Sequence, residues 1–133
     1  MRNYEAAMDG HIVMGLIHVT TVLRARENAP KNYTAEFLVD TGATDSMAPG
    51  KGLKKAGIKP RGRTTYELAN GQTVEYNFGL VEIEFLGEIT SGRIIFGPDD
   101  AEPILGVTAL ESVGILIDPA NRTPKRMPAI PLK

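Results

Sequence analysis

Short runs of β-branched and aromatic residues, broken by glycine, proline and asparagine, limit most strongly what this chain can fold into. A helical pattern is clear only over residues 106–114, which glycine bounds at both ends, and a weaker signal for a helical turn lies near residues 52–56. The pattern predicts an all-β protein with one short helix. Strands are expected over residues 16–24, 34–39, 64–69, 72–77, 80–86, 89–96 and 115–117.

The amino-acid composition excludes several kinds of function. The 133 residues suit one domain, and 42% hydrophobic with 23% charged residues is ordinary for a globular protein. A net charge of −1 gives the whole molecule no field that would attract nucleic acid or a membrane. The chain has no cysteine, so disulfides, thiol catalysis and thiolate metal sites are excluded.

The apolar N-terminal run, residues 11–23, is too short for a transmembrane helix and contains two histidines. It also lacks the basic start and the small-residue cleavage site of a secretory signal. We therefore expect a cytoplasmic protein.

A weak internal repeat divides the chain into two halves. Gly42 follows the start of "GLIHVTTVL" by 27 positions, and Gly106 follows the start of "GLVEIEFLG" by the same interval. Each glycine is followed by a polar stretch and a Gly-Ile pair. The spacing favours two half-units related by a pseudo-twofold axis, with Gly42 equivalent to Gly106.

The stretch "AEFLVDTGATDSMAP" carries the main functional signal. Phe37, Leu38 and Val39 run directly into Asp40, which Thr41-Gly42 follows. Aspartate and glycine often simply form a turn after a strand. An unpaired carboxylate at the end of a buried strand is costly, however, so Asp40 needs hydration, hydrogen bonds or a chemical role.

These residues resemble the active-site loop of the aspartic peptidases, in particular the single-lobe retropepsin-like group of small prokaryotic proteins. Asp40, Thr41 and Gly42 match the family signature residue for residue. "PILGVTALESVGI" is similar to the second landmark of the family, two apolar residues, a glycine and the sole helix. "YELANGQTVEY" lies where the flap hairpin belongs. The resemblance implies a closed β-barrel lobe and an aspartic endopeptidase without metal or other cofactor.

The resemblance also implies an active site shared between two copies of the chain. One Asp-Thr-Gly is present, and the chain is too short for two lobes, so the second Asp40 is expected from a twofold-related copy. Two carboxylates at close range share one proton, so one activates water while the other donates a proton. By resemblance, Thr41 locks the two loops together. Gly42 leaves room for the carboxylate and the substrate.

The three residues after Gly42 are expected to contact substrate. Ala43 stands where some relatives carry serine, whose hydroxyl favours the charged carboxylate. Alanine lacks this hydroxyl, so we expect a less acidic pH optimum than that of digestive aspartic proteases. Thr44 and Asp45 lie where family members bind the substrate backbone.

Asn70-Gly71 predicts a β-hairpin with a two-residue turn. This turn would pair Leu68 with Thr73 and Tyr66 with Glu75. The hairpin is interpreted as a flap whose residues Leu68, Ala69, Asn70 and Gly71 contact substrate, although an ordinary hairpin against a partner sheet would show the same pattern.

The chain ends are expected to lie outside the protease domain, which we assign to residues 14–118. Residues 1–13 are interpreted as a loosely ordered N-terminal extension, and residues 119–133 as a proline-rich basic tail. Three states of the tail are open: a hairpin at residues 118–121 that adds a strand at the dimer edge, disorder, and occupation of the cleft as an autoinhibitory peptide.

Other functions are less well supported. Residues 51–63 hold six cations and no acid, but aromatic residues are not interleaved, so a solvated surface is favoured over a nucleic-acid site. His11 and His18 lack the carboxylate pattern of a metal site. The main rival hypothesis is a retropepsin-like dimerisation or peptide-binding module with little turnover. A nucleic-acid binder is a third, and membrane binding is not expected.

Overall fold

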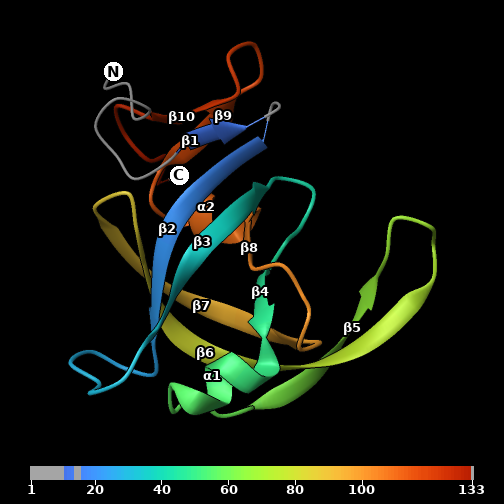
Figure 1. Cartoon of the computed structure of the whole chain (residues 1–133). Helices are drawn as coiled ribbons and strands as arrows, with labels where there is room; N and C mark the ends of the chain where they lie inside the picture. The colour runs from blue at the N-terminus through green and yellow to red at the C-terminus, as the bar shows by residue number, and fades with distance from the viewer. Residues whose placement is uncertain (1–10, 14–15, 133) are drawn as a thin grey trace.

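The computed structural model describes residues 11–13 and 16–132. Strands dominate, so the predicted all-β class is confirmed (Figure 1). Two helices are present, and α1 follows the weaker helical signal. In chain order the elements are β1 (His11–Val13), β2 (Leu16–Arg24), β3 (Tyr33–Asp40), β4 (Ser46–Pro49), α1 (Gly50–Lys55), β5 (Gly62–Glu67), β6 (Thr73–Phe85), β7 (Glu88–Gly97), β8 (Ile104–Gly106), α2 (Val107–Ser112), β9 (Ile115–Asp118) and β10 (Thr123–Arg126).

The main sheet closes on itself. Its strands run in the order β1-β2-β3-β8-β4-β7-β6-β5, and β2 also pairs with β6. The ring β2-β3-β8-β4-β7-β6 is therefore a small barrel filled by side chains. Buried apolar residues from both halves of the chain form its core, among them Val19, Leu23, Phe37, Ile83, Ile94, Leu105 and Leu110.

The pairings relate the two halves of the chain. β3 pairs with β8 and β4 pairs with β7, both in parallel, while β2 and β6 pair antiparallel. A helix follows β4 in the first half and β8 in the second. The two-half organisation is thus present, but the equivalence of Gly42 and Gly106 is wrong. Gly42 lies in the loop before β4, whereas Gly106 ends β8, the strand that corresponds to β4.

One strand replaces two predicted ones. β6 runs through Gly79, although the sequence pattern predicts a break between residues 77 and 80. A Cβ on Gly79 would lie 2.9 Å from the carbonyl oxygen of Lys59. This glycine therefore permits a close backbone approach inside a strand rather than a turn.

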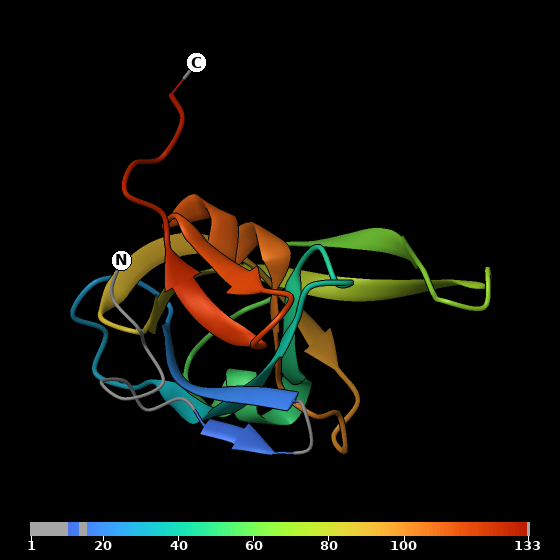
Figure 2. The same cartoon turned by 90° about the horizontal axis from the view of Figure 1, so that it is seen from above.

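The ends of the domain carry further strands. Residues 1–10 lie outside the described part of the chain, and His11–Val13 pairs with Leu16–His18 as β1. After β9 the chain turns back, so that Thr123–Arg126 pairs antiparallel with Ile115–Asp118. Of the three alternatives for the tail, these residues therefore form the hairpin, while its place at a dimer edge stays a prediction. Figure 2 shows the segment after β10 leading away from the body. None of the helices in the described residues has the length and apolar character needed to span a bilayer.

The β9–β10 hairpin depends on Asp118. Its carboxylate lies 3.0 Å from Lys125 Nζ, and its Oδ1 accepts the Ala120 N–H at 2.8 Å. The Lys125 contact, followed by the Ala120 hydrogen bond, lowers the Asp118 pKa below its ordinary value of 3.8. A lowered pKa stabilises the fold above the unfolded-state pKa, and this stability is lost as pH falls through the folded-state pKa.

We expect Asp118→Asn to destabilise the protein at neutral pH, because it removes the charge that Lys125 contacts. The difference from wild type should shrink as pH falls below about 3.8. Urea unfolding midpoints from pH 7 to 3 measure this, with the exposed Glu111→Gln as control. A destabilisation of equal size at pH 3 and pH 7 would contradict the assignment.

Candidate active site

Asp40 is the last residue of β3 and is held by a tight turn. In the parallel pairing with β8 it lies opposite Gly106. The Gly42 N–H donates to Asp40 Oδ1 at 3.0 Å, and the Ala43 N–H donates to the Asp40 carbonyl at 3.1 Å. A Cβ on Gly42 would lie 3.3 Å from Oδ1, tighter than most real contacts. The turn thus orients the carboxylate through one oxygen, and Asp40 as a whole is partly exposed.

The second half of the chain fixes the position of this loop. The Val107 N–H donates to the Ala43 carbonyl at 2.8 Å, and the Thr108 N–H donates to the Thr44 carbonyl at 3.2 Å. Below them, the buried Ser46 Oγ accepts the Gly106 N–H at 3.0 Å. The predicted landmark "PILG" therefore acts by anchoring the Asp40 loop through the start of α2.

The β5–β6 hairpin forms an arm that projects from the barrel (Figure 1). Its predicted register is wrong by one residue: Tyr66 pairs with Val74 and Glu67 with Thr73. The two-residue type I′ turn predicted for Asn70-Gly71 needs positive φ at both residues, but of these only Gly71 has it. The Asn70 side chain instead accepts the Gln72 N–H at 2.9 Å, which lengthens the turn.

The corrected register changes which side chains share a face of the arm. Tyr66, Val74 and Tyr76 are half-buried on one face, while Glu67 and Glu75 on the other are exposed. The Tyr66 and Tyr76 rings are 6.4 Å apart at 48°. The arm therefore has one apolar face, instead of the two that the predicted register gives.

Tyr66 connects the arm to the Asp40 loop. Its hydroxyl donates to Asp45 Oδ2 at 2.8 Å. Burial raises the Tyr66 pKa above 10.0, and the hydrogen bond to Asp45 raises it further. The phenol is therefore protonated at neutral pH and remains a donor.

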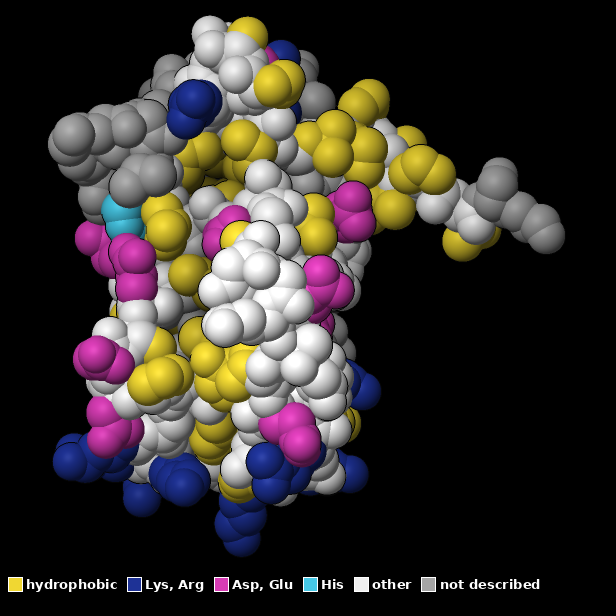
Figure 3. Space-filling view, turned by 90° about the vertical axis from the view of Figure 1, so that its right-hand side faces the viewer, with side chains coloured by type: hydrophobic (Ala, Val, Ile, Leu, Met, Phe, Trp, Pro, Cys, Tyr) yellow, Lys and Arg dark blue, Asp and Glu magenta, His cyan; other side chains and the backbone are white. Residues whose placement is uncertain are grey.

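A cleft of about 590 Å³ lies between the arm and the Asp40 loop. Figure 3 looks onto this side of the molecule, with hydrophobic side chains around the hollow and most Lys and Arg side chains at the lower end. The cleft is lined by Asp40, Gly42, Ala43, Thr44, Asp45, Met47, Thr65, Tyr66, Glu67, Leu68, Ala69, Tyr76, Ile95 and Ile104.

Most of the predicted site residues line this cleft, but three do not. Thr41 lines a separate hollow of about 350 Å³ together with Asp40 and Asp118, and Asn70 and Gly71 lie in the turn at the end of the arm. Sequence reasoning missed Tyr76 and the apolar floor of the cleft, Met47, Ile95 and Ile104. The alternation of β5 and β6 carries the signal for Tyr76 once the register is known. The floor depends on pairings between distant strands.

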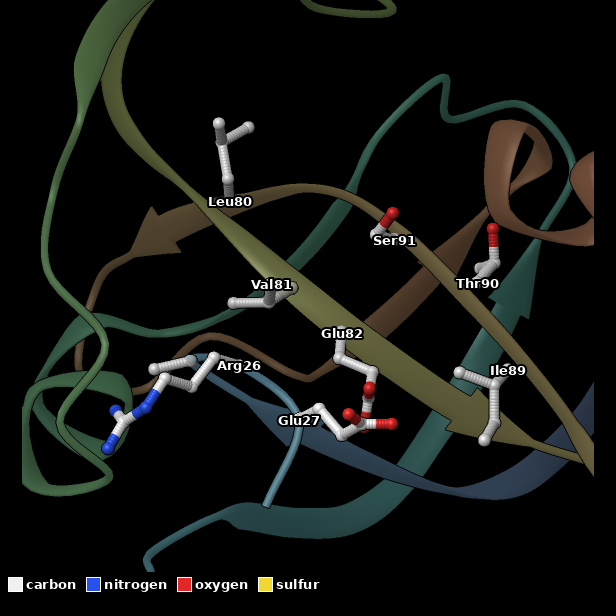
Figure 4. Close-up of a pocket in the computed structure, with 9 residues that line it drawn as sticks. Arg26, Glu27, Leu80, Val81, Glu82, Ile89, Thr90 and Ser91 are labelled. Atoms are coloured by element: carbon white, nitrogen blue, oxygen red, sulfur yellow. The ribbon is translucent and has the colours of Figure 1, made fainter. Parts of the chain in front are cut away.

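Another hollow, of about 520 Å³, lies over β6 and β7 beside the loop after β2, and no predicted site residue lines it (Figure 4). Glu27, Glu82 and Ile89 border it, and Arg26 extends away from the two carboxylates. Arg24 already contacts Glu82 at 3.4 Å. We see no arrangement of catalytic groups there.

The described residues contain no cluster of three or more His, Cys, Asp or Glu suited to a metal ion. His18 Nε2 lies 3.4 Å from Glu102 Oε2, and the side chain of His11 lies outside the described residues. The cleft lining itself offers carboxylates, the hydroxyls of threonine and tyrosine, and backbone groups.

A comparison with known protein families finds a match over the segment that contains this site. A family model described as gag-polyprotein putative aspartyl protease matches residues 30–112, more than half of the chain. This range includes the Asp40 loop, the arm and α2. A search of curated proteins found no match.

Proposed function

Because the chain belongs to this gag-polyprotein aspartyl protease family, a retropepsin-like family, we propose that it is an aspartic endopeptidase active as a homodimer. Family membership supports protease-like chemistry in general. The finer proposal is that peptide bonds are hydrolysed by water activated between two Asp40 carboxylates. We also propose that the enzyme acts in the cytoplasm, since a sequence without cysteine suits a reducing compartment.

The main support for this proposal is the position of the Asp40 side chain and its lack of a charged partner in the part of the chain that the structure describes. It ends a strand of the barrel, borders both the cleft and the adjoining hollow, and takes part in no ion pair among the described residues. The Gly42 N–H holds one of its oxygens. A carboxylate with a structural role would more often be paired or fully hydrogen-bonded.

In the proposed mechanism the two Asp40 carboxyl groups share one proton. The ionised carboxylate takes a proton from water, whose oxygen attacks the peptide carbonyl carbon, while the protonated carboxyl donates to the carbonyl oxygen. The carboxyl that gained the proton from water then passes it to the leaving nitrogen, and the C–N bond breaks. The other carboxylate takes back a proton from a hydroxyl of the tetrahedral intermediate, which restores the shared proton and releases the carboxylic acid and amine products. Thr41, beside Asp40 and exposed in one copy, is assigned to the contact between the two loops.

The main alternative is a dimeric peptide-binding module with little turnover. It would use the same cleft and arm but would need no carboxylate pair. Cleavage of peptides separates the two hypotheses.

The experiment that tests the proposal is digestion of an unbiased peptide mixture from pH 4 to 8, with products identified by mass spectrometry. We expect cleavage with an optimum less acidic than that of digestive aspartic proteases, because Ala43 offers Asp40 no hydroxyl donor. Specific activity should rise with protein concentration below the dimer dissociation constant. A constant specific activity at dilutions where the chain is shown to be monomeric would indicate a contaminant or a monomeric site. No cleavage at any pH would favour the binding module.

A further inference from the structure

We propose that the cleft selects peptides that carry a lysine or arginine side chain close to the scissile bond, and that Asp45 is the residue that binds it. This inference rests on the proposed function, since it names the substrate class of the same site. The same preference for a basic side chain is expected in peptide binding, even if the bound peptide is cleaved slowly.

The charge of the cleft lining is the first observation. Three carboxylates line it, Asp40, Asp45 and Glu67, and no lysine, arginine or histidine does. The six cations of residues 51–63 do not line it either. Because low-dielectric walls concentrate the field of such groups, the cleft attracts cationic side chains although the whole chain is nearly neutral.

Asp45 is the carboxylate placed to bind a cation. Tyr66 donates to its Oδ2 at 2.8 Å, which fixes the carboxylate while leaving Oδ1 without a hydrogen-bond partner among the described residues. The side chain is partly buried, so solvent screens it less than a surface acid. A lysine ammonium or arginine guanidinium can therefore bind Oδ1 without breaking the Tyr66 hydrogen bond.

The other two carboxylates fit this role less well. Asp40 is assigned to the chemistry, and a cation held there would oppose the sharing of a proton between two copies. Glu67 borders the cleft but is exposed, so solvent screens its charge more than that of Asp45. Of the two carboxylates not assigned to the chemistry, Asp45 is the one that combines partial burial with a fixed orientation.

A cation already bound to Asp45 would weaken the inference, and Arg93 is the nearest candidate. Its guanidinium lies 3.9 Å from the centre of the Phe78 ring and donates to Thr64 Oγ1 at 2.8 Å. Arg93 also interacts with the Tyr66 hydroxyl, which by itself lowers the pKa of that group, and borders a small hollow together with Asp45. It nevertheless forms no ion pair with Asp45, so the second carboxylate oxygen is left for a ligand.

The floor of the cleft supplies the other half of the recognition. Met47, Ile95 and Ile104 line it from the barrel side, and Tyr76 from the arm. An apolar substrate side chain fits this surface. The expected substrate is therefore an extended segment with an apolar residue at the scissile bond and a basic residue within a few positions of it.

Two pools of octapeptides test this, identical except for lysine or glutamine at one position and with Leu, Ile or Phe at the centre. Cleavage by the wild-type chain gives a kcat/KM ratio, and fluorescence anisotropy with the full-length Asp40→Asn chain gives a ratio of affinities. We expect the lysine pool to be favoured roughly tenfold, between the values typical of exposed ion pairs and charge-assisted hydrogen bonds. Asp45→Asn should bring the ratio close to one.

Matched control variants test whether the preference for lysine arises at Asp45. Glu27→Gln removes a carboxylate of the exposed loop after β2, outside the cleft, and should leave the ratio unchanged. Tyr66→Phe keeps the Asp45 charge but removes the hydroxyl that fixes it, so the ratio should fall only in part. Raising the salt concentration from 0.05 to 0.5 M should reduce the preference of the wild-type chain, which needs no variant to fold.

The outcomes separate this inference from the proposed function. Equal cleavage of both pools would overturn the inference and leave the endopeptidase standing. Preferential binding of the lysine pool without cleavage would support the inference and overturn the endopeptidase. A lysine preference that persists in a folded Asp45→Asn chain would overturn the role of Asp45.

Discussion

Asp40→Asn should abolish peptide hydrolysis, with a fall in kcat of at least about a thousandfold, since general acid–base catalysis contributes roughly a hundred- to ten-thousandfold and both functions are lost together. Asparagine keeps the shape of the side chain and can still accept the Gly42 N–H. It cannot take a proton from water or share one with a second copy. The measurement is kcat/KM on a cleaved peptide, with the urea unfolding midpoint showing that the variant is folded.

The same variant tests whether the site is shared. When wild-type and Asp40→Asn chains exchange freely, equal amounts should leave about one quarter of the dimers with two intact carboxylates. Activity should therefore fall to about a quarter of that of the all-wild-type sample at the same total concentration. Half of the activity would mean that each chain works alone. Undiminished activity in the pure variant would place the catalytic group elsewhere.

The strands with strong local signals could be predicted from the sequence. The predicted bounds of β2, residues 16–24, are the observed ones, because alternation and β-branching act within the strand itself. The Asp40 loop could be recognised for the same reason, since "FLVDTG" is contiguous. The short strands β4 and β8 could not be predicted. A proline ends β4, and both strands exist because they pair across the two halves of the chain.

The arm shows why the site was only partly predictable. Asn70-Gly71 correctly indicated a hairpin, but its register depends on the backbone conformation of one residue, Asn70. A shift of one position exchanges the two faces of the arm. The hydrogen bond between Tyr66 and Asp45 requires that register together with the closed barrel. No local pattern encodes a contact of this kind.

Gly106→Ala should be the most damaging single methyl addition near the cleft. A Cβ on Gly106 would lie 2.7 Å from the Asp45 carbonyl carbon and 2.8 Å from the carbonyl oxygens of Asp45 and Thr44. These are backbone atoms, so a side-chain rotation cannot relieve the contact. We expect a loss of about 3 kcal/mol in the free energy of unfolding, toward the upper end for overpacked sites.

Activity should fall further than stability alone explains, because the atoms that must move belong to the loop that carries the catalytic group. The Gly106 N–H also donates to the buried Ser46 Oγ, so a shift of β8 strains a second anchor of the same loop. Gly92→Ala in β7 is the matched control, since its Cβ would meet only Ile83 Cδ1, at 3.9 Å. Urea unfolding and kcat/KM at a temperature where both variants are folded measure the two effects. If Gly106→Ala matched Gly92→Ala in both, the close packing of β8 against the Asp40 loop would not be what positions the carboxylate.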